Sequence, residues 1–169
     1  ENTGMIVDAG KWIFKEAVKL CGEWLKYCPD FKMSINISYI QLFDDNFIDF
    51  VSDTIRNSDA DFSNIIIELT ESRFVTDKEF LNNMFSNFRK MGIDIAMDDF
   101  GTGYSSLEVL KEVPADIVKI NRAFVKNIKE SIFDKNFIRF AVELCHNVGI
   151  KVCLEGIENI EEYKIVHDM

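Results

Sequence analysis

The sequence has little proline, little histidine and no long apolar run. Its 169 residues include two prolines and two histidines. No apolar stretch reaches the ~18 residues of a membrane-spanning helix, and we recognise neither a secretory signal nor a low-complexity tract. These absences predict a soluble, cytoplasmic domain with no membrane contact by this segment. A membrane anchor in other parts of a longer protein stays open.

Positive charge is also scarce. Lysine and arginine number 19 against 29 aspartates and glutamates, which gives a formal net charge of −10. Such a surface repels the phosphates of DNA and RNA, because binding them depends on clusters of Lys and Arg. We therefore expect no nucleic-acid polymer as a partner. A small anionic ligand remains compatible where metal ions supply the positive charge.

The cysteines show no metal-binding or redox pattern. None forms a C-x-x-C pair, and most lie in apolar runs: Cys21, Cys28, Cys145 and Cys153. With so few histidines they do not suggest a zinc site. We expect reduced thiols packed as small apolar side chains, which fits a reducing cytoplasm.

Helical and strand-like segments alternate along the chain. Apolar residues at helical spacing, among them Trp12, Leu20 and Trp24, predict a first helix over 8–27. A continuous β-branched run predicts a buried strand over 64–69. The same reasoning predicts strands over 32–36, 93–97, 116–120 and 150–154, and helices over 45–56, 77–91, 105–111 and 160–169, with a further helix that reaches about Val148 and breaks near Ser131.

This alternation implies parallel strands joined by helical crossovers, either in a doubly wound sheet or in a (β/α) barrel. A polar residue lies at the end of each predicted strand: Asn36, Glu68, Asp98, Lys119 and Glu155. Successive members of this set are about one βα unit of ~30 residues apart. Functional groups at the ends of several strands are typical of barrel enzymes, whereas a doubly wound sheet gathers its ligands at one switch point. We favour an α/β fold, a partial TIM-like (β/α) barrel formed by residues 1–169 as one incomplete domain.

Side-chain oxygens would converge if these strands share one rim: those of Asn36, Glu68, Asp98, Asp99 and Glu155. Carboxylates this close repel each other unless cations lie between them, and oxygen donors favour Mg²⁺ or Mn²⁺. Two such ions suit phosphodiester hydrolysis by water. The lone base, Lys119, could pair with a carboxylate, hold a phosphate or orient a water. The competing interpretation is that the acids are ordinary residues at helix N-termini.

The most specific signal is the string DDFGTGYSSL over 98–107. Two acids end a strand, the glycines permit a tight turn, and Ser105 or Ser106 can cap the next helix. The string resembles the DDFGTGYSS loop of the EAL family of cyclic di-GMP phosphodiesterases. Further stretches agree in order and spacing: ENTGMI at 1–6, NIS at 36–38, ELTES at 68–72, DIVKI at 116–120 and EGIE at 155–158.

The resemblance implies a modified TIM barrel that opens cyclic di-GMP to linear pGpG with Mg²⁺ or Mn²⁺. It implies metal ligands at Asn36, Glu68, Asp98 and Glu155, and a catalytic lysine at Lys119. Asp99 resembles the acid that faces the second metal and its water, so that Lys119, Asp99 and Glu155 form the catalytic set. Glu71 resembles the glutamate that holds the DDFGTG loop, and Glu158 a supporting acid. A homodimer and regulatory or cyclase domains elsewhere in the protein are also implied.

The sequence departs from the family pattern in three places. The Glu-Ala-Leu triplet and a later Q-G-[YF] segment are absent, and we expect both to lie beyond the ends of this segment. Asn121 stands where the family usually has aspartate. It retains an oxygen ligand but removes a negative charge, which is expected to weaken the second divalent ion.

Three functions fit these residues: an active phosphodiesterase, a degenerate receptor that binds cyclic di-GMP without cutting it, and an interaction scaffold. The retained acids and Lys119 favour the first, because unpaired carboxylates destabilise a protein that has no use for them. We expect the 169-residue segment alone to show little or no turnover.

Overall fold

The computed structural model describes residues 5–70, 78–103, 106–112 and 115–169. These residues form one five-stranded sheet in the order β1-β2-β3-β4-β5, and every neighbouring pair is parallel. The strands are β1 (Met33–Asn36), β2 (Ile65–Thr70), β3 (Asp94–Phe100), β4 (Ile117–Ile120) and β5 (Lys151–Leu154). The prediction of an α/β fold with parallel strands is therefore confirmed.

Helices connect the strands. The α-helices are α1 (Met5–Leu25), α2 (Phe47–Arg56), α4 (Lys78–Met91), α5 (Ser106–Glu112), α6 (Arg122–Lys126), α7 (Ile132–Asn147) and α8 (Ile160–His167). Two short 3₁₀ helices, η1 (Tyr39–Phe43) and η2 (Phe62–Asn64), were not predicted. The predicted break near Ser131 is real, because its side chain caps α7 by accepting a hydrogen bond from the Asp134 amide.

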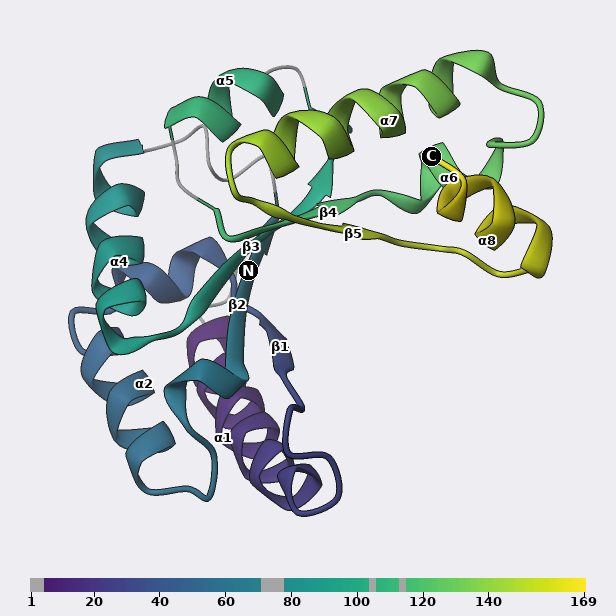
Figure 1. Ribbon diagram of the computed structural model, residues 1–169. Coiled ribbons are helices and arrows are strands. Elements are labelled where there is room, and N and C mark those ends of the chain that lie inside the picture. The colour runs from purple at the N-terminus through teal and green to yellow at the C-terminus, as the bar shows by residue number, and fades with distance from the viewer. Residues whose placement is uncertain (1–4, 71–77, 104–105, 113–114) are drawn as a thin grey trace.

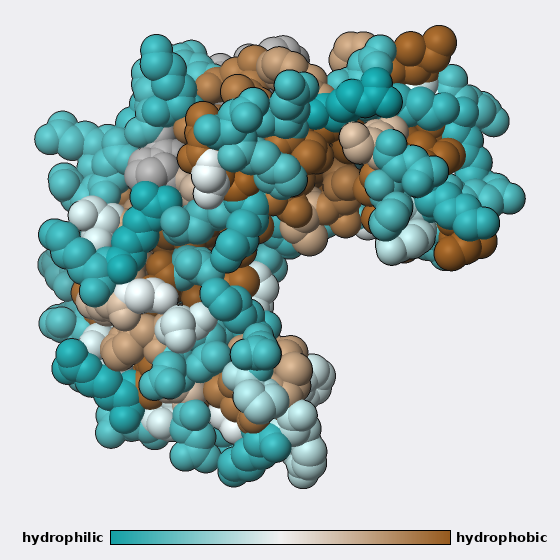
Figure 2. All heavy atoms as spheres, viewed as in Figure 1, coloured by the Kyte–Doolittle hydropathy of each residue, from teal (hydrophilic) through white to brown (hydrophobic). Residues whose placement is uncertain are grey.

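The described chain has the shape of a crescent (Figure 1). One arm consists of α1, α2 and α4, the other of α6 and α8, and the strands run through the middle (Figure 1). In the space-filling view a broad hollow separates the two arms (Figure 2). In the described residues β1 and β5 are the two edges of the sheet.

The hydrophobic core lies on the helix-covered face of the sheet. Ile67 of β2, Ile95 of β3 and Val118 of β4 are fully buried, and they share one cluster with Phe14 of α1 and Phe85 of α4. Because side chains alternate along a strand, the residues between them point to the other face. That face carries Ser34, Asn36, Glu68, Asp98, Lys119 and Cys153.

The buried side of α1 is not the one that predicted the helix. Trp12, Leu20 and Trp24 are 64%, 44% and 53% exposed, whereas Phe14 and Val18 face the core. Helical spacing identifies an amphipathic helix, but two apolar stripes on one helix leave the choice of buried side to tertiary packing.

The four cysteines are free thiols. Cys21 and Cys145 are buried, as expected for small apolar side chains, whereas Cys28 and Cys153 are exposed. Among the described residues, no helix combines the length and the apolar character that crossing a membrane requires.

Candidate active site

Three carboxylates from three strand ends surround one lysine. The Lys119 Nζ lies 2.7 Å from Glu155 Oε1, 3.1 Å from Glu68 Oε1 and 3.4 Å from Asp98 Oδ1. Glu68 comes from β2, Asp98 from β3 and Lys119 from β4, while Glu155 directly follows β5. The structure therefore brings together four of the predicted site residues at the carboxyl ends of parallel strands.

The ammonium of Lys119 is held in its charged form. Burial opposes the charge, but hydrogen bonds to Glu155 and Glu68 and the charges of Glu68 and Asp98 outweigh it and raise the pKa of Lys119 above its ordinary value. Lys119 thus acts as the local counter-ion of the acidic cluster.

Glu68 is the most buried member of the cluster, with 4% of its surface exposed. A buried carboxylate needs polar partners, and Glu68 has two. It accepts hydrogen bonds from Lys119 Nζ and from the Ser34 hydroxyl. Sequence reasoning missed Ser34, although its place two residues before Asn36 on the same strand puts both side chains on one face.

The two adjacent acids of β3 point to different partners. The β3–β4 register shifts between Met97 and Phe100, which is the mark of a bulge. Asp99 has a left-handed backbone with φ of 59°, the one positive φ of a non-glycine residue among those described. Asp98 faces Lys119, whereas Asp99 Oδ1 accepts a hydrogen bond of 2.6 Å from Asn121 Nδ2. The bulge thus gives two consecutive carboxylates two separate positions.

The other predicted residues lie around this cluster. Asn36 ends β1 as an exposed residue and pairs in register with Glu68. Glu158 is exposed, and its backbone amide donates to Glu162 rather than to the cluster. It lines a groove of about 430 Å³ together with Asn121. Glu71 lies outside the described residues.

The donor chemistry of the cluster fits a divalent cation. Within the described ranges, no three acidic, histidine or cysteine side chains form a ready cation site, and Lys119 occupies the space between the carboxylates. Three negative charges against one positive charge leave two negative charges uncompensated, all on oxygen donors. That is the charge and the ligand type that Mg²⁺ and Mn²⁺ match.

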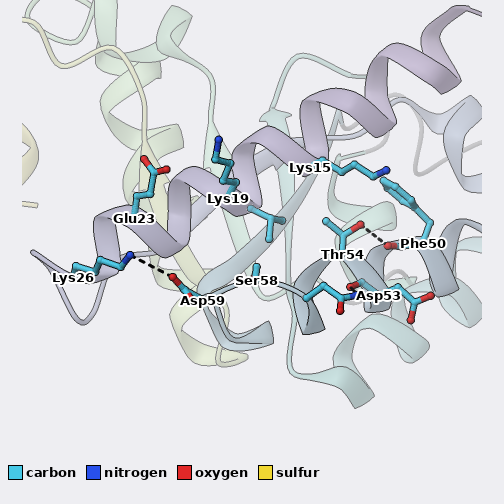
Figure 3. A pocket seen from close by; sticks show the side chains of 11 residues that line it. Lys15, Lys19, Glu23, Lys26, Phe50, Asp53, Thr54, Ser58 and Asp59 are labelled. Atoms are coloured by element: carbon cyan, nitrogen blue, oxygen red, sulfur yellow. Dashed lines mark hydrogen bonds and ion pairs between the residues drawn. The ribbon is translucent and has the colours of Figure 1, made fainter.

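A larger groove, of about 700 Å³, lies elsewhere, between α1 and α2 (Figure 3). None of the predicted site residues lines it. Its charged groups are partly paired: Lys26 lies 3.3 Å from Asp59 (Figure 3). Size alone therefore does not make this groove the candidate site, whereas the convergence of titratable groups favours the cluster around Lys119.

The family of the chain follows from comparison with known proteins. A family model described as the EAL domain matches residues 1–169. The chain belongs to the EAL domain family. The predicted family is thereby confirmed.

Curated relatives of this EAL domain are much longer proteins. It is 33% identical over 159 residues to the bifunctional diguanylate cyclase/cyclic di-GMP phosphodiesterase MucR of Pseudomonas aeruginosa, covering 94% of this chain and 23% of MucR. It is 29% identical over 162 residues to the cyclic di-GMP phosphodiesterase PdeR of Escherichia coli, covering 96% of this chain and 24% of PdeR. The chain spans about a quarter of the length of these relatives.

A solved structure supports the fold. The PaMucR phosphodiesterase in complex with c-di-GMP superposes on this EAL domain with a TM-score of 0.91 and 31% sequence identity, covering 99% of this chain and 68% of that chain. EAL domains have a TIM-barrel fold, so the predicted TIM-like arrangement of parallel strands is confirmed.

Proposed function

We propose that this EAL domain hydrolyses cyclic di-GMP to linear pGpG with Mg²⁺ or Mn²⁺. The observation that carries the proposal is the convergence of Glu68, Asp98 and Glu155 on Lys119 at 2.7–3.4 Å. The relatives MucR and PdeR, both described as cyclic di-GMP phosphodiesterases, support the choice of substrate.

The carboxylates of Glu68, Asp98 and Glu155, with the Asn36 amide oxygen, would hold the cation. When bound, the cation lowers the pKa of a coordinated water and offsets phosphate charge. Lys119 already touches the carboxylates, so its ammonium would stay beside the phosphate and stabilise the charge that develops on it. Asp99 would orient the attacking water from the neighbouring position, and Glu155 would combine binding of the cation with positioning of that water. Glu71 and Glu158 would support this arrangement.

The wider setting is part of the same proposal. Because the chain spans about a quarter of its curated relatives, we infer regulatory or cyclase domains elsewhere in the protein. The free thiols fit a cytoplasmic location. A homodimer stays a prediction, as does the absence of DNA, RNA and membrane contacts for this segment.

The test is a hydrolysis assay on the full-length protein, in which pGpG is separated from cyclic di-GMP in the presence of Mn²⁺, Mg²⁺ or EDTA. Asp98→Asn removes one carboxylate charge and should lower turnover by at least ~10³-fold. The matched control is Cys153→Ala, since Cys153 is exposed beside Lys119 in the strand register yet has no role in the proposed chemistry. Turnover that survives EDTA, or equal losses in both variants, would refute the proposal.

A receptor without turnover is the second candidate. The observation that favours it is the hydrogen bond between Asn121 and Asp99, which engages one oxygen of the second acid. Tight binding of cyclic di-GMP by calorimetry, with no pGpG formed under any metal condition, would identify a receptor.

A further inference from the structure

Asn121 bridges the turn after β3 and the start of α6. Its Nδ2 donates to Asp99 Oδ1 at 2.6 Å, and its Oδ1 accepts from the Ala123 backbone amide at 2.8 Å. Its own backbone amide donates to the Phe100 carbonyl. The N-cap of α6 and the carboxylate of Asp99 are therefore joined through one side chain.

The orientation of this amide follows from its two partners. A carboxylate accepts hydrogen bonds and a backbone N–H donates one. Rotating the amide by 180° would set oxygen against oxygen at Asp99 and NH₂ against N–H at Ala123. The nitrogen therefore faces Asp99, and the oxygen is engaged in the helix cap.

A hydrogen-bond donor and a metal ion compete for the same oxygen. The amide of Asn121 covers Oδ1 of Asp99, and it offers that position no oxygen of its own. The main Lys119 cluster is separate, because Asp98 rather than Asp99 faces it. The position beside Asp99 thus has one carboxylate, and its Oδ1 is already hydrogen-bonded. The atom of residue 121 that faces it is a nitrogen and not a second carboxylate oxygen.

We propose that Asn121 takes the place of a cation beside Asp99, so that this EAL domain binds one divalent ion fewer than it would with aspartate at position 121. The inference rests on the proposed function, since it assumes an ion at the Lys119 cluster. With aspartate, two carboxylate oxygens would lie as close as the present 2.6 Å contact, and a divalent cation between them would offset their repulsion.

The substitution Asn121→Asp tests this by exchanging only the side-chain NH₂ group for an oxygen. Aspartate is as good an N-cap as asparagine, so the hydrogen bond to Ala123 is retained and only the group that faces Asp99 changes from NH₂ to oxygen. The experiment counts Mn²⁺ ions per chain in the full-length protein at pH 7.5, by titration calorimetry and by the electron paramagnetic resonance signal of free Mn²⁺. We expect the count to rise by one, and two neighbouring Mn²⁺ ions should show spin coupling that the parent protein lacks.

The matched control is Asn159→Asp, which adds the same charge at the N-cap of α8, where the side chain accepts from the amides of Glu161 and Glu162. Its Mn²⁺ count should stay unchanged. Asn121→Ser keeps a capping oxygen and replaces the NH₂ group that reaches Asp99 by a shorter hydroxyl, so it should admit the extra ion at lower affinity than aspartate does. If Asn121→Asp does not fold, the Mn²⁺ count of Asn121→Ser tests the role of Asn121 instead.

The outcomes separate this inference from the proposed function. No Mn²⁺ bound by either the parent protein or Asn121→Asp would contradict the metal-dependent function. An equal count above zero in both, or a rise in Asn159→Asp as well, would overturn the role of Asn121 and leave the Lys119 cluster as proposed.

Discussion

At the scale of single residues, the site depends on how a buried acid is satisfied. Glu68 is almost fully buried and is stabilised by Ser34 from the neighbouring strand and by Lys119 from the strand beyond β3. A buried charge without partners destabilises a protein strongly. Lys119 therefore stabilises the fold in addition to forming part of the candidate site.

Substitution of Lys119 by methionine should expose that dependence. Without the ammonium, Glu68, Asp98 and Glu155 repel each other, so in EDTA the free energy of unfolding should fall by roughly 2–4 kcal/mol. Saturating Mn²⁺ should restore more stability to this variant than it adds to the parent protein. Urea unfolding with and without Mn²⁺ measures both effects. Lys129→Met is the control, because its pair with Glu161 is solvent-exposed and screened by water, so its loss should leave the stability almost unchanged.

The raised pKa of Lys119 also implies that the stability of the protein depends on pH. The pKa of Lys119 is raised from its ordinary value of 10.5 by its carboxylate partners, so the folded state binds this proton more tightly than the unfolded chain. The resulting stability is fully present below pH 10.5 and is lost as the pH rises through the higher folded-state pKa. In EDTA, the stability difference between the parent protein and Lys119→Met should therefore shrink above about pH 10.5. A constant difference up to pH 12 would contradict this linkage.

At the scale of elements, the turn after β3 is packed against α6 and α7. Gly101 has a φ of +94°, and a Cβ there would lie 2.7 Å from the rings of Phe124 and Phe137. Those two rings stack on each other with centroids 4.2 Å apart. The turn that carries the acids is therefore positioned by aromatic packing on the helix side.

Gly101→Ala should disturb this packing. Strain from the positive φ adds to overlap with the two rings, so the variant should lose roughly 2–4 kcal/mol of unfolding free energy. Gly149→Ala separates the two causes, since Gly149 also has a positive φ, of +79°, but its Cβ would meet nothing within 4 Å. That control should lose about 1–2 kcal/mol from strain alone. Equal losses would show that the aromatic rings do not constrain the turn.

At the scale of the whole molecule, the site spans the sheet from edge to edge. Asn36 ends β1 and Glu155 follows β5, and these are the outer strands of the described sheet. The solved phosphodiesterase chain is longer, and this segment matches 68% of it. The positions of the Asn36 and Glu155 side-chain oxygens therefore depend on what holds the two edge strands in place.

The 169-residue segment by itself should therefore turn over cyclic di-GMP at least ~10²-fold more slowly than the full-length protein, because small displacements of catalytic groups lower rates steeply. Parallel assays with Mn²⁺ at equal concentrations test this, and circular dichroism establishes that the segment is folded. Equal rates would show that residues 1–169 contain everything that the chemistry needs.

The parallel α/β fold and the family could be predicted from the sequence because both depend on local patterns. Strand–helix alternation and the DDFGTG string need no long-range information. The same patterns placed Glu68, Asp98 and Glu155 at strand ends, where parallel strands make such residues neighbours.

Only the tertiary structure decided which atoms meet. The sequence suggested three partners for Lys119, and packing brought it to the carboxylates. The sequence assigned Asn121 an oxygen toward a metal, whereas the α6 cap takes that oxygen and turns the nitrogen toward Asp99. Composition and spacing determine which elements form, but side-chain direction depends on bulges, caps and neighbouring elements that lie far apart in the chain.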